Sequence, residues 1–224
     1  SDCGAAATIT VFPDPTIVAN VDEDFICEGD EITLHGTGGA TYSWSPAFVI
    51  DDEPFTPPLG VSTYIVTGTT VVGCVNTDTI TIEVFESPTV TGLADDYAIC
   101  YGETVTFSGA GALSYEWSPG AIENGVPYSP PTAGETIYTV IGTNGVGCQA
   151  SDEVTVTMNA EIVLSYTVID ESVGVDGSID LTVAGGTPSY TFDWDNDGTG
   201  DFDDTEDLAE LAGGTYIVVI SDAA

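Results

Sequence analysis

Hydrophobic and polar residues alternate with a period of two in short runs along the whole chain. Examples are ITL (32–34), TYSW (41–44), TYIVT (63–67) and TITIEV (79–84), in which Thr alternates with Val, Ile or Tyr. Clusters of Gly, Pro, Asn and Asp interrupt these runs about every 8–12 residues, and no stretch keeps the period of a helix. The pattern predicts an all-β chain of short antiparallel strands that pack as β-sandwiches.

The chain contains two copies of one sequence unit. Residues 26–46 (ICEGDEITLHGTGGATYSWSP) match residues 99–119 (ICYGETVTFSGAGALSYEWSP) without a gap, at a shift of 73 residues. A match of this length indicates repeated domains. We predict one β-sandwich domain at residues 13–86 and a second at residues 87–159.

A third unit at residues 160–224 repeats the same skeleton with a different sequence. Its segment GGTPSYTFDW (185–194) is similar to GGATYSW (38–44). The spacing from a Trp to a later Tyr is 20, 21 and 22 residues in the pairs Trp44/Tyr64, Trp117/Tyr138 and Trp194/Tyr216. We predict a third β-sandwich of the same architecture that lacks its last strand.

Residues 1–12, which precede the first predicted domain, do not belong to any of the three units. Residues 1–12 (SDCGAAATITVF) form a single predicted strand without a hairpin partner. Joined end to end, the termini read VVISDAA…SDCGAAATITVF, which has the shape of VTGTTVVGCVNTDTITIEV in the first copy. We expect residues 1–12 to be the closing strand of a preceding, truncated repeat. Strand donation or end-to-end packing between copies is a further expectation, because a missing strand exposes a sheet edge.

The charge of the chain excludes several classes of function. It has 37 Asp and Glu residues, one His and neither Lys nor Arg, for a net charge of −37. Nucleic acids and anionic membrane surfaces are bound through Lys and Arg, so neither is an expected partner. No run approaches the roughly 18 apolar residues of a membrane span, and we expect no direct membrane insertion. Hydrophobic residues, at 42%, are nevertheless sufficient for folded cores.

Alternating acids in DWDNDGTGDFDD (193–204) predict a calcium loop. Alternate oxygen ligands, a Gly for the bend and a later carboxylate are typical of such loops. The predicted metal ligands are Asp193, Asp195, Asp197, Asp201 and Asp204. The alternatives are a solvated acidic hairpin and screening of its charge by sodium or magnesium.

Five cysteines, at positions 3, 27, 74, 100 and 148, indicate an oxidising compartment. Cys27 and Cys74 of the first copy match Cys100 and Cys148 of the second, which favours one disulfide inside each copy. A bond between neighbouring domains is the alternative if Cys27 lies at the far end of its sandwich. Long spacings and a single His argue against a metal site here. Cys3 is left over, and we expect its partner outside this sequence.

Catalysis is not predicted. His35, the only histidine, is replaced by Ser108 in the second copy, so we interpret it as a strand side chain. Small sandwiches without long loops provide no cleft for paired acids. Aromatic pairs recur at one place in each unit, which core packing explains more simply than a sugar-stacking platform. These pairs are Tyr42/Trp44, Tyr115/Trp117 and Phe192/Trp194.

These motifs resemble those of known families. The first two units, with IC-x-G-x-x-[IV]-T, Y-x-WSP and TY-x-V followed by GC, are similar to the bacterial immunoglobulin-like and PKD-like repeats of secreted Bacteroidetes proteins. The third, with DGSIDLTVAGGTPSYTFDW (176–194) and LAGGTYIVVISDA (211–223), resembles the SprB-type repeat of gliding-motility adhesins. The resemblance implies tandem immunoglobulin-like β-sandwich domains in a linear array. It also implies a very long adhesin on the bacterial cell surface, exported by the type 9 pathway.

We therefore predict a non-catalytic structural stalk segment of a long tandem-repeat bacterial surface adhesin or filament. Its expected partners are neighbouring repeats of the same array, with surface glycans and a prey or host cell surface as further candidates. The alternative is a glycan-binding accessory module of a secreted enzyme. An exposed row of aromatic side chains would favour that alternative, and buried aromatics favour the stalk.

Overall fold

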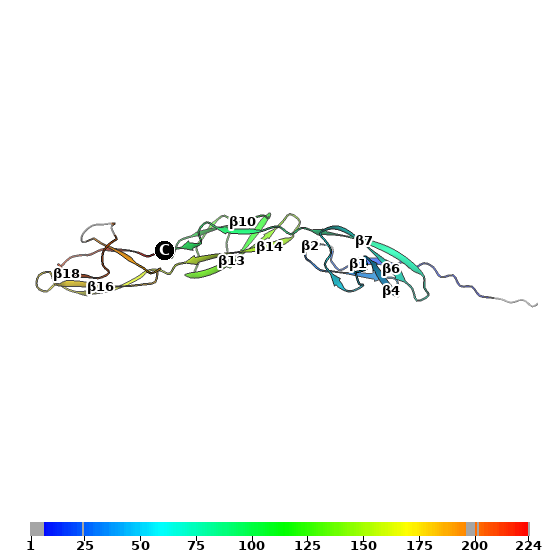
Figure 1. Ribbon diagram of the computed structural model, residues 1–224, viewed down its shortest axis with the longest axis horizontal. Helices are drawn as coiled ribbons and strands as arrows, with labels where there is room; N and C mark the ends of the chain where they lie inside the picture. Colours follow the sequence, from blue (N-terminus) through cyan, green and yellow to red (C-terminus); the bar gives the residue numbers. More distant parts are fainter. Residues whose placement is uncertain (1–6, 24, 196–199, 201, 224) are drawn as a thin grey trace, which may run out of the picture. The chain divides into compact units, whose positions relative to one another are not determined.

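The chain was analysed as a computed structural model, which describes residues 7–23, 25–195, 200 and 202–223. All regular elements in this part of the chain are β-strands, so the prediction of an all-β fold is confirmed (Figure 1). It follows that no helix among the described residues has the length and apolar character to cross a membrane. The chain divides into two compact units: residues 1–88 with 144–149, and residues 89–143 with 150–224.

The strands of the first copy form two sheets, in the orders β1-β3-β5 and β2-β7-β6-β4. The long strands β6 and β7 form the antiparallel hairpin drawn in cyan to teal (Figure 1), with Tyr64 opposite Ile80. The short strand β2 runs parallel to the end of β7, which places Cys27 beside Phe85. The strands are β1 (Val18–Val21), β2 (Ile26–Cys27), β3 (Ile32–Thr37), β4 (Thr41–Ser45), β5 (Pro54–Phe55), β6 (Gly60–Thr69) and β7 (Val75–Phe85).

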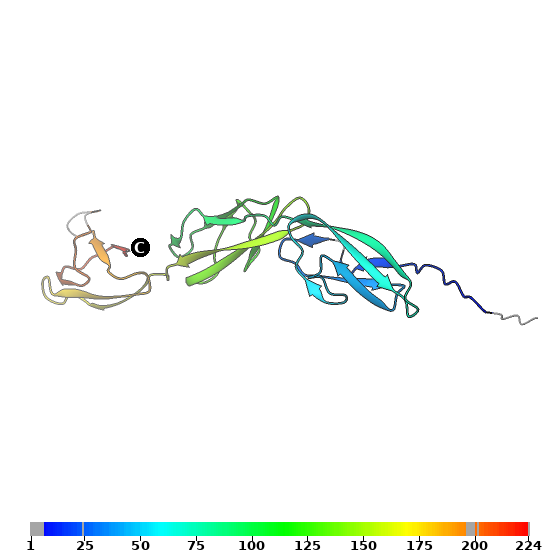
Figure 2. The same ribbon diagram turned by 45° about the vertical axis from the view of Figure 1, so that its right-hand side comes forward.

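The strands of the second copy repeat this arrangement, in the orders β12-β10-β8 and β11-β13-β14-β9. Every strand of the first copy therefore has a counterpart seven elements later. The long pair β13 and β14 is drawn in green to yellow-green (Figure 2). The strands are β8 (Thr91–Ala94), β9 (Ala98–Ile99), β10 (Val105–Ala110), β11 (Ser114–Ser118), β12 (Pro127–Tyr128), β13 (Gly134–Thr143) and β14 (Gln149–Met158).

The third domain has one complete sheet, β15-β16-β18, and a second sheet of only two strands, β17-β19. Trp194 lies opposite Val218, as Trp44 lies opposite Val66, so β17 and β19 correspond to β4 and β6. Among the described residues, no strand takes the places of β7 and β2. The strands are β15 (Val163–Ile169), β16 (Gly177–Ala184), β17 (Thr191–Trp194), β18 (Leu208–Leu211) and β19 (Val218–Ser221).

The hydrophobic cores reflect this difference. The first and second copies each bury a large cluster around a Trp and a Tyr, and Tyr64 and Tyr138 are both only 1% exposed. In the third domain the fully buried cluster shrinks to Leu181, Phe192 and Trp194. Tyr216, at the position of Tyr64, is only half-buried. The third core is thus open on the side where a covering strand is missing from the described residues.

Several carboxylates of this chain accept hydrogen bonds from backbone N–H groups, and the sequence provides no Lys or Arg to pair with them. Asp78 Oδ2 on β7 accepts the Ala19 N–H at 2.9 Å, and Asp152 Oδ2 on β14 accepts the Gly92 N–H at 2.9 Å. In both cases this backbone hydrogen bond lowers the pKa of the carboxyl from its usual value. The acidic side chains therefore tie β7 to β1 and β14 to β8, in addition to giving the chain its charge.

Residues 7–12 do not form the predicted strand. In this segment Ile9 is 87% exposed and Val11 is 88% exposed, with no regular secondary structure. A single strand satisfies its backbone groups only in a sheet, so an alternating sequence remains unpaired until a partner edge is available. That residues 1–12 close a preceding repeat stays a prediction.

Candidate functional site

A disulfide joins the two copies. Cys27 at the end of β2 is bonded to Cys148 in the turn before β14, with the Cα atoms 5.6 Å apart and a sequence separation of 121. Cys148 is fully buried. This turn, residues 144–149, belongs to the same compact unit as the first copy.

The favoured prediction of one disulfide inside each copy is wrong. Cys27 lies beside Phe85 at the end of β7, whereas Cys74 directly precedes Val75 at its beginning. At about 3.4 Å per residue, this strand separates the two cysteines by roughly 34 Å, far beyond the reach of a disulfide. Cys100 and Cys148 are separated in the same way along β14. The alternative, a bond from one domain to the next, is the one that forms.

The Asn144 side chain makes hydrogen bonds both within the turn of residues 144–149 and to the first copy. Asn144 Oδ1 accepts the backbone N–H groups of Val146 and Cys148, at 3.1 and 3.0 Å. Its Nδ2 donates to the Glu86 carbonyl at 2.8 Å. Asn144 therefore both shapes the turn and attaches it to the end of the first copy. Its role was not predicted, because the sequence of the turn contains no signal for a contact so distant along the chain.

An aromatic pair also contacts this turn. The rings of Phe25 and Phe85 stack with their centroids 5.8 Å apart. Gly147 lies against the Phe25 ring, so that an added Cβ would be 3.5 Å from Phe25 Cζ. The turn is thus fixed by one covalent bond, one amide hydrogen bond and one packed ring.

The other two described cysteines, Cys74 and Cys100, lie at the positions that correspond to Cys148 and Cys27 and form no disulfide. Cys100 follows β9 as Cys27 ends β2, and Cys74 lies in the turn that corresponds to that of Cys148; both are reduced. Desolvation, followed by the negative charges of Glu103 and Asp222, raises the pKa of the Cys100 thiol. Cys3 lies outside the described residues.

The predicted calcium ligands are only partly described. Asp193 is 6% exposed; its Oδ2 accepts the Gly200 N–H at 2.6 Å, and its Oδ1 is buried without a hydrogen-bond partner among the described atoms. Asp195 Oδ1 accepts the Ile217 N–H at 3.0 Å, and Asp204 Oδ2 accepts the Trp194 N–H at 2.5 Å. Asp197 and Asp201 lie outside the described residues.

Within the described ranges, no three His, Cys, Asp or Glu side chains converge on a metal position. The distinctive feature of the loop is therefore the single orphaned oxygen of Asp193. A buried carboxylate oxygen without a donor is costly, and a bound cation would compensate that cost.

The recurrent tryptophans are core residues. Trp44 and Trp117 are each 6% exposed, and Trp194 is 3% exposed. Trp44 Nε1 donates to Asp51 Oδ1 at 2.8 Å, and Trp194 Nε1 donates to the Thr205 carbonyl at 3.1 Å. The indoles therefore stabilise the sandwiches and are not displayed for sugar stacking. His35 lies on β3, paired with Asn20 of β1, as expected for a strand side chain.

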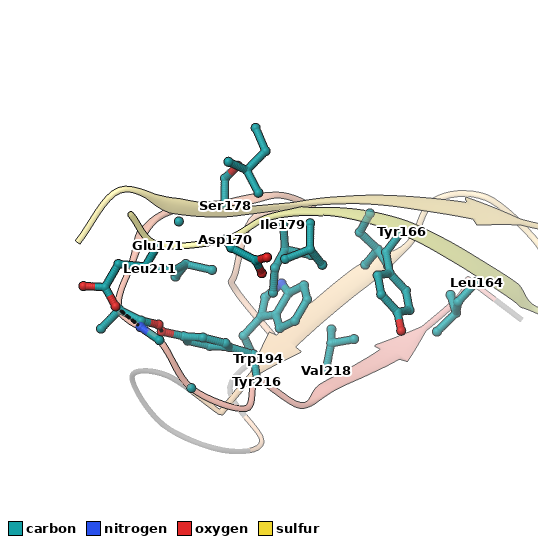
Figure 3. A pocket seen from close by; sticks show the side chains of 17 residues that line it. Leu164, Tyr166, Asp170, Glu171, Ser178, Ile179, Trp194, Leu211, Tyr216 and Val218 are labelled. Atoms are coloured by element: carbon teal, nitrogen blue, oxygen red, sulfur yellow. Dashed lines mark hydrogen bonds between the residues drawn. The ribbon is translucent and has the colours of Figure 1, made fainter. Parts of the chain in front are cut away.

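A groove of about 390 Å³ opens between the two sheets of the third domain. Trp194 and Val218 lie on one side, and Leu164, Tyr166 and Ile179 lie on the other (Figure 3). At one end the Gly213 N–H donates to Glu171 Oε2 at 2.6 Å. The sequence predicted a missing strand but not this groove. The one available signal was the large Leu164 and Tyr166 on β15, where β8 has Gly92 and Ala94.

One family model matches a part of the third domain. Residues 174–199 match the model of the SprB repeat, which confirms the resemblance found in the third unit. A search of the curated proteins gives no match.

Similar solved structures are arrays of immunoglobulin domains. The N-terminal eight Ig domains of Down Syndrome Cell Adhesion Molecule isoform 1.30.30 align at 17% identity over 93% of this chain, with a TM-score of 0.37. This chain spans 38% of that structure. The I-band fragment I67–I69 of titin aligns at 13% identity over 95% of both chains, with a TM-score of 0.39.

Proposed function

We propose that this chain is a non-catalytic, force-bearing stalk segment of a long tandem-repeat bacterial surface adhesin or filament. Tandem β-sandwiches and the SprB match support a structural surface repeat. A place in a gliding-type adhesin, export by the type 9 pathway and an extracellular location are parts of the same proposal. The disulfide is consistent with an oxidising location.

The observation that carries the proposal is the Cys27–Cys148 bond. Force applied to the two ends of the chain passes through this bond, so the residues between the two cysteines are excluded from extension. These roughly 120 residues would otherwise lengthen by about 400 Å when unfolded, at about 3.5 Å per residue. Under a load that exceeds the stability of one sandwich, a stalk with this bond lengthens only through residues outside the loop that the bond closes.

Single-molecule pulling tests the proposal. The full chain is held at its two ends between stable marker domains, and its unfolding lengths are recorded with and without a reducing agent. We expect the oxidised chain to release only the length of residues outside 28–147, and reduction to add the hidden length of about 400 Å. The Cys27→Ser chain should show the full length without reduction, and Cys74→Ser should behave as the unmodified chain.

Equal unfolding lengths before and after reduction would remove the mechanical argument. Binding of the same chain to immobilised glycans provides the opposing test, because the accessory-module alternative requires it. The burial of Trp44, Trp117 and Trp194 supports the stalk over that alternative.

We propose in addition that the loop after β17 binds calcium through Asp193, with Asp195 and Asp204 beside it. The orphaned Asp193 Oδ1 supports this assignment, since a divalent cation satisfies a buried carboxylate oxygen. Thermal unfolding with calcium and with EDTA tests it. We expect calcium to raise the unfolding temperature, and Asp193→Asn to abolish the rise. Asp180→Asn, which removes the same charge from an exposed position on β16, should retain it. No difference between calcium and EDTA would leave the loop as a solvated acidic hairpin.

A further inference from the structure

The third domain presents a free sheet edge at β19. In the first copy β6 pairs with β4 on one side and with β7 on the other. In the third domain β19 pairs with β17 in the same register, with Trp194 opposite Val218, and no described strand lies on its other side. The missing neighbour is the counterpart of β7.

The groove lies where that neighbour would pack. Its lining includes Gly213, Gly214, Tyr216 and Val218, which lead into and form β19. The opposite strand β15 is exposed along its whole length, and Tyr166 is 69% exposed. In the second copy the last strand covers β8, the counterpart of β15: a Cβ added to Gly92 on β8 would lie 2.9 Å from Val154 of β14. The groove is thus the space that a last strand occupies in the other two domains.

A segment of this chain has the sequence of that strand. Thr8-Ile9-Thr10-Val11 repeats Thr79-Ile80-Thr81-Ile82 of β7, and Cys3 precedes Thr8 by five residues as Cys74 precedes Thr79. In β7 the Ile82 side chain is 4% exposed, and its counterpart in β14, Val156, is 2% exposed. The matching Val11 is 88% exposed, without a strand partner. These apolar side chains have the pattern of a core strand and no core of their own.

We propose that residues 7–12 of a second copy form a strand beside residues 213–218, at the free edge where β19 begins, and complete the third domain. With the register of β6 and β7, Thr8 lies opposite Ile217 and Val11 lies opposite Gly214, within the stretch that lines the groove. Ile9 and Val11 then face Trp194 and β15, as Ile80 and Ile82 face the first core. The copies join head to tail through this strand.

The chemistry of the segment favours a copy of this chain as the occupant. Residues 7–12 (ATITVF) carry no charge, so they approach an acidic chain without adding to its repulsion. Main-chain hydrogen bonds to an open edge and alternate side chains in a groove are a known mode of strand recognition. The inference rests on the proposed structural role, to which it adds a way for copies to join.

Sedimentation of the full chain tests whether copies associate through this strand. We expect the average mass of the full chain in sedimentation to rise with concentration in steps of one chain, and the amides of residues 213–218, which face the added strand in this register, to gain protection from hydrogen exchange. The double variant Ile9→Asp/Val11→Asp should remain monomeric and folded, because both side chains are exposed in the single chain. Val71→Asp is the matched control: Val71 is 91% exposed in the turn after β6 and should not alter association.

A second chain carries an extra copy of residues 1–15 after Ala224. We expect this chain to be monomeric, with residues 213–218 protected, because its groove is filled from within. A mass that does not change with concentration for the unmodified chain would overturn the second copy as the occupant, even if the appended strand protects residues 213–218. Association that persists in Ile9→Asp/Val11→Asp would overturn the proposed strand. Neither result affects the pulling experiment, which depends on the disulfide alone.

Discussion

Replacing Cys27 with Ser should destabilise the first unit by about 2–4 kcal/mol, the usual contribution of a native disulfide. Chain entropy alone gives an upper value of about 5 kcal/mol for the loop closed by this bond, since 121 residues separate the two cysteines. Cys27 is the better position to change. It is half-buried, so a Ser hydroxyl there stays hydrated, whereas Cys148 is fully buried.

Urea unfolding followed by tryptophan fluorescence measures the effect. With a urea dependence of about 1–3 kcal/mol per molar, the midpoint should fall by roughly 1–2 M. Cys74→Ser provides the control, because its thiol is unpaired in the structure and should leave the midpoint unchanged. The within-copy pairing predicts the opposite: Cys74→Ser would then cost as much as Cys27→Ser. That result, or an unchanged midpoint for Cys27→Ser, would refute the reasoning.

Mass spectrometry of the unreduced chain identifies the pairing directly. Trypsin has no site in a sequence without Lys and Arg, so the digestion requires a protease specific for acidic residues. We expect a linked pair of peptides that contain Cys27 and Cys148. A linked pair with Cys27 and Cys74 would contradict the structure.

Three further predictions concern single side chains. Because the backbone bond from Gly92 lowers the pKa of Asp152, its stabilisation is complete above the unfolded value of 3.8 and is lost as the pH falls through the folded pKa. Asp152→Ala should therefore lower the urea midpoint at neutral pH and have a smaller effect once the pH is below the folded pKa of Asp152; an effect that grows in acid would contradict this sign. Gly102→Ala should cost about 1–2 kcal/mol for its left-handed backbone alone, since φ is +83° and open space surrounds it. Gly111→Ala should cost clearly more, because its Cβ would meet the Thr89 carbonyl oxygen; equal midpoints for the two variants would show that this contact relaxes freely. Desolvation and the charges of Glu103 and Asp222 raise the pKa of Cys100, so its thiol should react with iodoacetamide more slowly than a free cysteine, and Glu103→Gln should accelerate it; an unchanged rate would exclude the charge effect.

The sequence alone determined the features that depend on local alternation. Thr alternating with Val, Ile and Tyr predicted the strands, and the match of residues 26–46 with 99–119 predicted two sandwiches of one design. Burial of the three tryptophans followed from the same alternation, since each is spaced by two from another aromatic residue. In these cases the neighbours along the chain already specify which face of a strand points inward.

Only the tertiary structure decided the contacts between residues far apart in sequence. The matching places of Cys27/Cys74 and Cys100/Cys148 in the two copies favoured the wrong pairing, because position along the sequence does not show at which end of a long strand each thiol lies. That position follows from the parallel pairing of β2 with the end of β7, a contact about sixty residues apart. Asp193 is a second case. Alternation placed its side chain on the face opposite the buried Trp194, yet both are buried, and the N–H of Gly200, seven residues later, donates to the Asp193 carboxylate.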